Sequence, residues 1–258
     1  MRIIIEPDAA ALARRAATRV ATLIRRTPGC VLGLSTGRTP LALYSELVRR
    51  HREEGLSFAR VVIFGLDDYV GLPPEHGAGF TAYMSRNLFD HVDIDPANIH
   101  VLDGGADNLS DACESYEAAI SEAGGIDLQI LGIGRNGHIG FNEPGSSLGS
   151  RTRLKTLTRE TCEANAPAFE NPDELPRLVI TMGVGTILEA RSCLLLALGE
   201  EKALPVRDMV EGPITAQVPA SALQLHPDVI SILDEGAASK LLRRDYYRDA
   251  EEAQRHWP

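Results

Sequence analysis

The stretch from Ile130 to Arg153 reads ILGIGRNGHIGFNEPGSSLGSRTR, and the interpretation of the whole chain starts from it. It completes an apolar run, Ile126–Leu131, and then loses all periodicity in Gly, Asn, His, Glu and Pro. One imidazole, His138, and one carboxylate, Glu143, follow in backbone that cannot be regular helix because Pro and Gly interrupt it. Open α/β sheets bind ligands where an apolar strand ends in a polar, Gly-rich loop. We therefore expect this loop to carry the chemistry of the protein.

Apolar runs and amphipathic segments alternate on both sides of this loop. The runs that predict strands are Met1–Glu6, Cys30–Ser35, Val61–Leu66, Asn98–Leu102, Ile126–Leu131, Leu178–Thr181, Ser192–Leu198 and Val229–Leu233. The segments that predict helices are Ala9–Arg26, Pro40–His51, Phe80–His91, Ser110–Ala123, Thr186–Ala190, Lys202–Val210 and Ala237–Gln254. Strands that alternate with helices indicate βαβ units. We expect one domain, residues 1–258, of the α/β class, with an open, mostly parallel sheet and helices on both faces.

Composition narrows the kinds of partner. The chain has 258 residues, of which 36 are acidic and 26 basic, so its formal net charge is −10. Without a basic face it should not bind nucleic acid, whereas a small anion needs only a local cluster of donors. The four cysteines lie far apart without metal spacing, and Cys30 and Cys193 fall in apolar runs, which predicts free thiols in a reducing cytoplasm. Residues 1–8, MRIIIEPD, predict a strand and a helix start rather than a signal peptide, and no apolar run reaches membrane length.

The segment Gly33–Gly37, GLSTG, matches the G-x-S-x-G pattern of a hydrolase nucleophile and lies between a strand and a helix. In that interpretation Ser35 would be the nucleophile. The predicted helix, however, starts with Thr39 as N-cap and Pro40 as first residue, about four residues after the serine, whereas a nucleophile elbow needs a sharper turn. A loop of Ser, Thr, Gly and Arg before a helix N-terminus favours an anion, because free N–H groups and the helix dipole point at it. We therefore favour a phosphate-binding loop over a structural turn, and both over a nucleophile.

The segment Gly132–Gly137, GIGRNG, is a literal dinucleotide fingerprint after a strand. That motif requires a helix immediately afterwards, and HIGFNEPGSS cannot form one, so we interpret the match as accidental. His138 and Glu143 remain, and Asp67 and Asp68 follow another apolar strand at the same edge of the sheet. A single His is more often structural than catalytic, and the structural alternative for the two Asp residues is helix capping or turn formation. Together with an anion-binding loop, however, these residues predict a proton-transfer site for a phosphorylated substrate.

Five motifs carry a resemblance to a known family: STGRTP (35–40), LDDYVGLP (66–73), the 132–153 loop, TMGVGT (181–186) and LALGEEKA (196–203). In this order they resemble the glucosamine-6-phosphate deaminases, of the glucosamine/galactosamine-6-phosphate isomerase family. The resemblance implies a Rossmann-like sheet and the conversion of glucosamine 6-phosphate and water into fructose 6-phosphate and ammonia. It implies neither a metal nor an organic cofactor.

The resemblance also implies residue roles. Asp67 would move the C2 proton, His138 would assist opening of the sugar ring, and Glu143 would orient and charge His138. The family commonly has Asp where this chain has Asn136, and an amide can hydrogen-bond the imidazole but holds no negative charge. The positions implied to bind the substrate phosphate are Ser35, Thr36, Gly37, Arg38, Thr39 and Lys202.

A second departure lies in the segment 158–177, which we expect to form a mobile lid. The family can supply a phosphate-binding Arg just after the Ala164-Asn165 dipeptide, but the following APAFENP contains none. Arg38 stands where the family commonly has a second Gly, and we expect it to replace the missing lid cation.

Some family members are hexamers that N-acetylglucosamine 6-phosphate activates at subunit contacts. Four residues match that effector site, namely Ser146, Arg153, Lys155 and Tyr246. Arg153 and Lys155 are spaced to share one face of a strand. Ordinary exposed charge is the alternative, and a homo-oligomer stays open.

Three rival functions remain. A 6-phosphogluconolactonase would use the His to activate water and would not need Asp67 as a base for a C–H proton. A galactosamine-6-phosphate isomerase would carry the same motifs. A sugar-phosphate-binding regulator would keep the phosphate loop but would tolerate the loss of His138 and Asp67.

Overall fold

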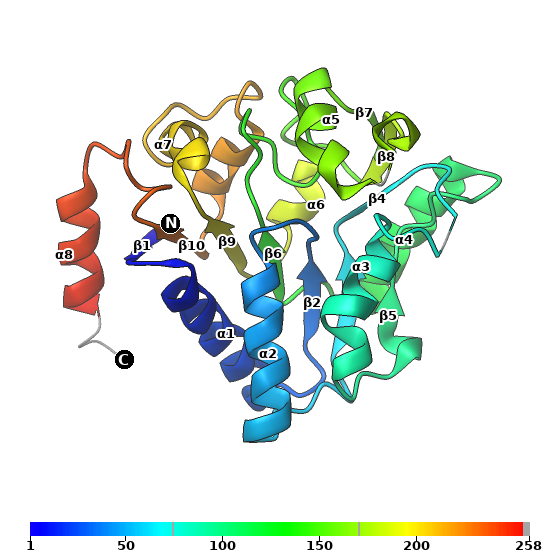
Figure 1. The fold of residues 1–258 in the computed structure, drawn as a ribbon, viewed down its shortest axis with the longest axis horizontal. Helices are drawn as coiled ribbons and strands as arrows, with labels where there is room; N and C mark the ends of the chain where they lie inside the picture. The colour runs from blue at the N-terminus through cyan, green and yellow to red at the C-terminus, as the bar shows by residue number, and fades with distance from the viewer. Residues whose placement is uncertain (74, 170, 255–258) are drawn as a thin grey trace.

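The computed structural model describes residues 1–73, 75–169 and 171–254. Its main sheet is parallel throughout, with seven strands in the order β1-β10-β9-β6-β2-β3-β5 (Figure 1). The strands are β1 (Arg2–Glu6), β2 (Val31–Leu34), β3 (Val62–Gly65), β5 (Ile99–His100), β6 (Leu128–Leu131), β9 (Cys193–Ala197) and β10 (Val229–Asp234). The predicted α/β class and the mostly parallel sheet are confirmed.

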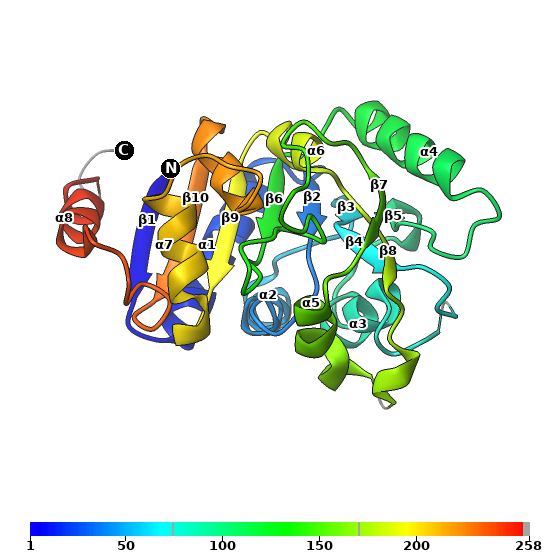
Figure 2. The same ribbon diagram turned by 90° about the horizontal axis from the view of Figure 1, so that it is seen from above.

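Helices cover both faces of this sheet, as predicted. Figure 2 shows α2 and α3 on one side and α4 and α6 on the other. One face packs on α1 (Ala9–Arg26), α2 (Leu41–Glu54) and α3 (Phe80–Asn87). The other face packs on α4 (Leu109–Glu122), α6 (Val184–Leu188), α7 (Ala203–Val210) and the 3-10 helix η6 (Pro219–Leu225). The remaining short 3-10 helices are η1 (Phe89–His91), η2 (Pro96–Asn98), η3 (Ala166–Ala168), η4 (Pro172–Glu174) and η5 (Glu200–Lys202).

Helix α1 illustrates how local sequence fixes an element. The Asp8 carboxylate caps it by accepting a hydrogen bond from the backbone N–H of Ala11 at 2.7 Å. Leu12, Ala16 and Val20 recur on one face and are fully buried against the sheet. No helix among the described residues is long and apolar enough to cross a membrane. All four cysteines are free, and Cys30 and Cys193 are buried, as predicted.

The strand order places the ligand-binding edge between β2 and β6. From β2 the chain continues to β3 and β5 on one side, whereas β6 is followed by β9 and β10 on the other. The loops that leave these two neighbouring strands therefore diverge, and a crevice opens at their carboxyl ends. The two loops singled out in the sequence, 35–40 and 132–149, are the ones that follow β2 and β6.

A second, three-stranded sheet was not predicted. It contains β4 (Asp67–Tyr69), β8 (Leu178–Thr181) and β7 (Arg153–Thr156), all antiparallel, and lies above the carboxyl edge of the main sheet (Figure 1). Asp67 therefore does not end the preceding strand, because it begins β4 and pairs with Thr181. Between β7 and β8 lies α5 (Arg159–Asn165), and the Thr158 side chain caps it by accepting from Thr161 N at 3.2 Å.

Several predicted helix boundaries are wrong. Helix α3 ends at Asn87 and is followed by η1 rather than continuing to residue 91, and α6 spans Val184–Leu188 rather than 186–190. Helix α2 begins at Leu41 after Pro40, and no side chain caps it, so Thr39 is not an N-cap. The last helix, α8, spans Arg244–Gln254 rather than 237–254. Its predicted first half is a series of turns because the Glu211 carboxylate accepts hydrogen bonds from the backbone N–H groups of Leu242 and Arg243. Helix α8 packs against the edge strand β1, far from β7 in both views (Figures 1 and 2).

Candidate active site

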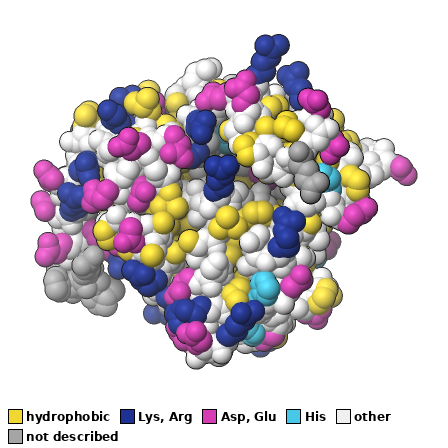
Figure 3. Space-filling view, viewed as in Figure 1, with side chains coloured by type: hydrophobic (Ala, Val, Ile, Leu, Met, Phe, Trp, Pro, Cys, Tyr) yellow, Lys and Arg dark blue, Asp and Glu magenta, His cyan; other side chains and the backbone are white. Residues whose placement is uncertain are grey.

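A cavity of about 530 Å³ opens at the crevice between the β2 and β6 loops. In Figure 3, which looks at the face of Figure 1, Lys and Arg side chains lie around the centre of that face. The residues predicted for the site that line the cavity are Ser35, Thr36, Gly37, Arg38, Thr39, Asp67, His138 and Lys202. Four separate chain segments thus meet at one cavity, and three of them, the loop 35–39, Asp67 and His138, were expected at one edge of the sheet. Asn136 and Glu143 do not line the cavity and lie behind His138.

The loop after β2 presents unused hydrogen-bond donors to this cavity. The Ser35 hydroxyl is buried and has no hydrogen-bond partner among the described residues. The backbone N–H groups of Thr36 to Thr39 likewise donate to no atom of that part of the chain, and the N-terminus of α2 behind them has no side-chain cap. Gly37 has φ +104°, which favours glycine. A ring of free donors at a helix N-terminus suits a phosphate.

The loop is held in place from behind. The Tyr44 hydroxyl donates to the carbonyl oxygen of Ser35 at 2.5 Å, and the Tyr83 hydroxyl donates to that of Gly37 at 2.5 Å. These two bonds use the carbonyl oxygens of Ser35 and Gly37, while the backbone N–H groups of the loop stay free. The loop is thus held in one conformation by two tyrosines.

Asp67 lies in the wall of the cavity at the start of β4. Its side chain is buried, and burial together with the neighbouring Asp68 charge raises the pKa of the Asp67 carboxyl from 3.8 to about 7. Asp68 has a different role, because its carboxylate accepts hydrogen bonds from the backbone N–H groups of Tyr69 at 2.8 Å and Phe80 at 3.2 Å. Asp67 is thus an acid whose proton comes and goes near neutral pH, as a general base requires.

His138 is fixed by Asn136. The Nδ1 atom of His138 lies 2.8 Å from Asn136 Oδ1, and Asn136 Nδ2 donates to Glu143 Oε2 at 2.7 Å. Because the amide nitrogen is used as the donor to Glu143, the amide oxygen must accept, so the proton of the neutral imidazole sits on Nδ1. The unprotonated Nε2 is then available for proton transfer.

Glu143 anchors this chain of hydrogen bonds. Its side chain is 3% exposed, and Oε2 lies 3.6 Å from His138 Nδ1. Burial alone would raise the pKa of the Glu143 carboxyl, but interactions with the neighbouring His138, Thr161 and Asn136 outweigh it and lower the pKa to about 2. Oε1 accepts from the backbone N–H and the hydroxyl of Thr158, the cap of α5. Glu143 is therefore a fixed anion behind the imidazole.

Gly134 makes room for the imidazole, a role that the sequence did not reveal. A Cβ atom at this position would lie 2.2 Å from Cε1 of His138 and 2.4 Å from its Nε2. Only a residue without a side chain lets the ring lie flat on the backbone here. The apparent dinucleotide fingerprint is thus a glycine-lined seat for His138 rather than a helix start, in agreement with its interpretation as accidental.

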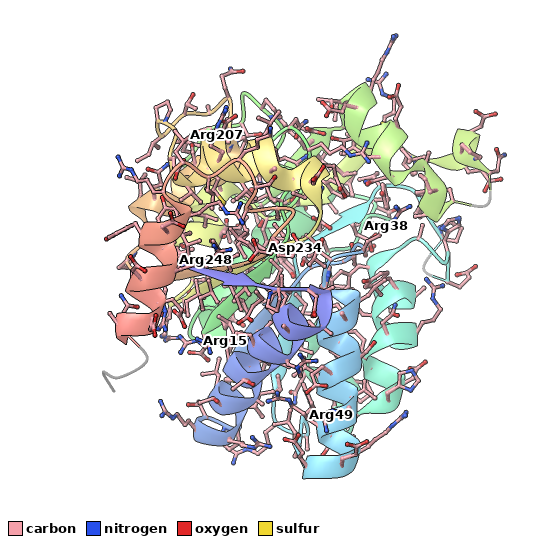
Figure 4. The ribbon with its side chains drawn as sticks, turned by 60° about the vertical axis from the view of Figure 1, so that its left-hand side comes forward. Arg15, Arg38, Arg49, Arg207, Asp234 and Arg248 are labelled. Carbon is pink, nitrogen blue, oxygen red and sulfur yellow. The ribbon has the colours of Figure 1, made fainter. Side chains whose placement is uncertain are left out.

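The lid segment 158–177 contains α5, η3 and η4, and residue 170 falls outside the described residues. Asn165 donates from Nδ2 to the Tyr69 hydroxyl at 3.0 Å, and the Tyr69 ring packs edge-on against Phe169. Both Asn165 and Tyr69 line the cavity, with Pro167 beside them. No cation of this segment lines the cavity among the described residues. Arg38 does line it, without a hydrogen bond or ion pair to the part of the chain that is described (Figure 4).

The predicted effector residues do not all meet within one chain. Ser146 is buried, its hydroxyl has no partner among the described residues, and the same holds for Arg153 Nη2. The other terminal nitrogen of Arg153 donates to Asn142 Oδ1 at 2.8 Å. Lys155 shares a half-buried face of β7 with Arg153, but Tyr246 is 65% exposed on the distant α8.

Three comparisons agree with this geometry. A model of the family of glucosamine-6-phosphate isomerases and 6-phosphogluconolactonases matches residues 7–231. The glucosamine-6-phosphate deaminase of Hahella chejuensis is 52% identical over 248 residues, which cover 96% of this chain and 95% of the relative. That of an Arthrobacter species is 49% identical over 257 residues, which cover 100% and 99%. Both relatives span nearly the whole chain.

Among solved structures, a monomeric glucosamine-6-phosphate deaminase is 42% identical with a TM-score of 0.91, covering 93% of this chain and 100% of that one. A 6-phosphogluconolactonase from Trypanosoma cruzi is 22% identical with a TM-score of 0.72, covering 93% and 97%, and shares the fold. The resemblance drawn from the motifs is confirmed over nearly the full length. The chain belongs to the family of glucosamine-6-phosphate isomerases and 6-phosphogluconolactonases.

Proposed function

We propose that this protein converts glucosamine 6-phosphate and water into fructose 6-phosphate and ammonia. The observation that carries the proposal is the position of Asp67 in the same cavity as His138 and the phosphate-binding loop. A lactonase needs no base for a C–H proton, whereas this cavity holds a buried carboxyl whose pKa of about 7 suits that task. The relatives at about half identity are named glucosamine-6-phosphate deaminases, which supports the same choice.

In the first step the phosphate binds the loop Ser35–Thr39 and Lys202, which positions the sugar. His138 Nε2 takes the proton of the C1 hydroxyl and returns it to the ring oxygen, so the ring opens to the amino aldehyde. The fixed negative charge of Glu143, relayed by Asn136, stabilises the imidazolium that forms between these two transfers.

In the second step the Asp67 carboxylate takes the C2 proton of the open chain and delivers a proton to C1. One amine proton passes to the C1 oxygen, so the C1 carbonyl becomes a hydroxyl, the double bond moves to C2, and the C2 amine becomes an imine. Water adds to this imine and ammonia leaves, which gives the ketone of fructose 6-phosphate. Asp67 recovers its starting state, and the balance needs only water.

The direct test measures ammonia formation from glucosamine 6-phosphate and galactosamine 6-phosphate, with hydrolysis of 6-phosphogluconolactone as a parallel assay. We expect ammonia from the glucosamine epimer and no lactone hydrolysis above the spontaneous rate. Ammonia only from the galactosamine epimer would reassign the substrate. Lactone hydrolysis without ammonia, or binding of both sugars without turnover, would instead establish the hydrolase or the non-catalytic regulator.

The same assay tests regulation. Unpartnered polar atoms of Ser146 and Arg153, both buried, suit an anionic effector, and burial lowers the pKa of the Arg153 guanidinium. We propose that N-acetylglucosamine 6-phosphate binds here and lowers the substrate concentration needed for half-maximal rate. Tyr246 could join such a site only from another subunit, so activation should require a homo-oligomer. If the protein sediments as a monomer and N-acetylglucosamine 6-phosphate still activates it, Tyr246 is not part of the effector site.

Arg38 is proposed to replace the missing lid cation, with segment 158–177 closing as a lid on a single domain in the cytoplasm. Arg38→Ala removes a free guanidinium from the cavity, so the KM for glucosamine 6-phosphate should rise about tenfold with little change in kcat. Steady-state ammonia release measures both constants. An unchanged KM would leave Arg38 without this role.

A further inference from the structure

Arg135 is a second arginine of the cavity that the motifs do not explain. It lies between Gly134 and Asn136, the two residues that seat and orient His138, and it lines the same cavity as Lys202 and the phosphate-binding loop. Its side chain is exposed to the cavity and forms no hydrogen bond or ion pair within residues 1–73, 75–169 and 171–254. Asn136 and His138 already use their side chains for each other, so Arg135 is free to contact a ligand.

The backbone that carries Arg135 is rigid. Gly137 N donates to the Gly134 carbonyl at 3.1 Å, and Gly134 N donates to the His138 carbonyl at 2.9 Å, which closes a tight turn around Arg135. Ala220 N donates to the Gly137 carbonyl at 2.9 Å and clips this turn to η6. The Arg135 guanidinium thus extends from a fixed point, unlike a cation carried by a lid.

Arg135 and Lys202 line the same cavity. Burial lowers the pKa of the Lys202 ammonium, Glu201 and Glu160 oppose this effect, and the positive charge of Arg135 adds to it. A dianion bound in the cavity would attract both cations and reduce their mutual repulsion. Glu201 is exposed at the rim, and neither Arg135 nor Lys202 forms an ion pair with it in the described part of the chain.

Other arginines of the cavity are less suited to this task. Arg86 donates to the Gly77 carbonyl at 2.6 Å and is therefore partly used. Arg38 is free but belongs to the loop after β2, whereas Arg135 comes from the loop after the neighbouring strand β6. A phosphate held by the loop can accept from Arg38 on one side and from the β6 side on the other.

We infer that Arg135 is a substrate-binding residue that pairs with Lys202 on the phosphate group, from the β6 loop. The identity of the sugar in this inference rests on the proposed function, whereas the binding of a phosphate group by Arg135 does not depend on it. It makes one rigid loop responsible for both ends of the substrate, because Arg135 would bind the phosphate and His138, three residues later, would act on the ring oxygen. The distance between phosphate and imidazole is then set by a turn and not by lid closure.

The test uses the full chain and inorganic phosphate as the probe, titrated in a calorimeter, together with steady-state ammonia release. Arg135→Met should weaken phosphate binding about 10- to 100-fold and raise the KM for glucosamine 6-phosphate by a similar factor, with kcat changed less than about threefold. Arg135→Lys keeps the charge but not the planar fork, so it should restore most of the affinity. The matched control is Arg207→Met, because Arg207 pairs with Asp208 on α7, well away from Arg38 in Figure 4, and should leave both constants unchanged.

Phosphate affinity and KM within about twofold of the unmodified protein in Arg135→Met would overturn the inference. So would a fall in kcat with unchanged phosphate affinity, since that would assign Arg135 to another step. If Arg135→Met fails to fold in a thermal melt, Arg135→Gln replaces it in the same comparison. If the unmodified protein releases no ammonia, the proposed function fails, but the phosphate titration still decides the role of Arg135.

Discussion

Asp67→Asn is expected to lower kcat/KM for ammonia release about 1,000-fold or more while leaving phosphate binding intact. The amide keeps the size of the carboxyl group but cannot take the C2 proton, and general bases typically contribute 10²- to 10⁴-fold. In the unmodified protein, kcat/KM should rise with pH and level off above about 7, because Asp67 must be ionised and its pKa is about 7. Stopped assays between pH 5 and 9 give both results.

The same substitution should stabilise the fold at alkaline pH. The folded-state pKa of Asp67 is raised from 3.8 to about 7, so the folded protein binds one proton more than the unfolded chain between these values. Its contribution to stability therefore falls as pH rises from about 4 to 7 and stays low above 7. Asp67→Asn removes this cost and should raise the free energy of unfolding at pH 8 by up to about 4 kcal/mol, with little gain at pH 4.

Asp68→Asn is the matched control for both measurements. Its Oδ1 can still accept from Tyr69 N and Phe80 N, so the turn into α3 should persist. Because the Asp68 charge helps to raise the pKa of Asp67, its removal should shift the rise of kcat/KM to lower pH without abolishing activity. An Asp67→Asn variant that retained activity, or a pH profile that Asp68→Asn did not move, would contradict the assignment of Asp67 as the base.

Gly134→Ala should reduce kcat about 100-fold, because the added methyl group would displace the His138 imidazole. The added methyl carbon would lie 2.2 Å from Cε1 of His138, so the ring must leave its hydrogen bond to Asn136. Ring opening then loses its proton carrier, whereas the loop Ser35–Thr39 is untouched. We expect phosphate affinity within about threefold of the unmodified protein and a stability loss of about 1–3 kcal/mol from overpacking.

Gly149→Ala controls for the loss of a glycine from the same loop, because no heavy atom lies within 4 Å of the added Cβ and its φ is not positive. It should behave like the unmodified protein. The His138 ring signals in NMR spectra would report the displacement directly. Full activity of Gly134→Ala with an unmoved imidazole would show that the seat described here is not needed.

Sequence patterns predicted the main sheet well and the second sheet poorly. Strands β3 and β9 are apolar throughout, as is typical of strands buried on both faces, and helix periodicity identified α1. Strand β4 contains two aspartates in three residues and carries no strand signal by itself, whereas the alternation of Arg153 and Lys155 does fit the strand β7. Their pairing with β8 comes from tertiary structure, which no local pattern encodes.

The candidate site shows the same division. His138, Glu143 and the donors of 35–39 could be singled out because their residue types suit proton transfer and anion binding. A glycine in a sequence does not show which side chain occupies the space beside it. The packing of the His138 ring against Gly134 could therefore be seen only in the structure. The direct contact of His138 with Asn136 rather than with Glu143 likewise depends on side-chain positions, since both residues lie within the same loop.

The pairing of β4 with β8 determines which of two neighbouring acids, Asp67 or Asp68, faces the cavity. Asp67 and Asp68 are chemically identical neighbours, and successive residues of a strand point to opposite sides. The strand register pairs Asp67 with Thr181 and Asp68 with Ile180. It places the Asp67 carboxylate in the cavity and the Asp68 carboxylate at the start of α3. A slip of that frame by a single residue would exchange the two acids. The register of β4 against β8 therefore decides which aspartate can act as the proposed base. An insertion near residues 65–69 should reduce activity far more than most substitutions there.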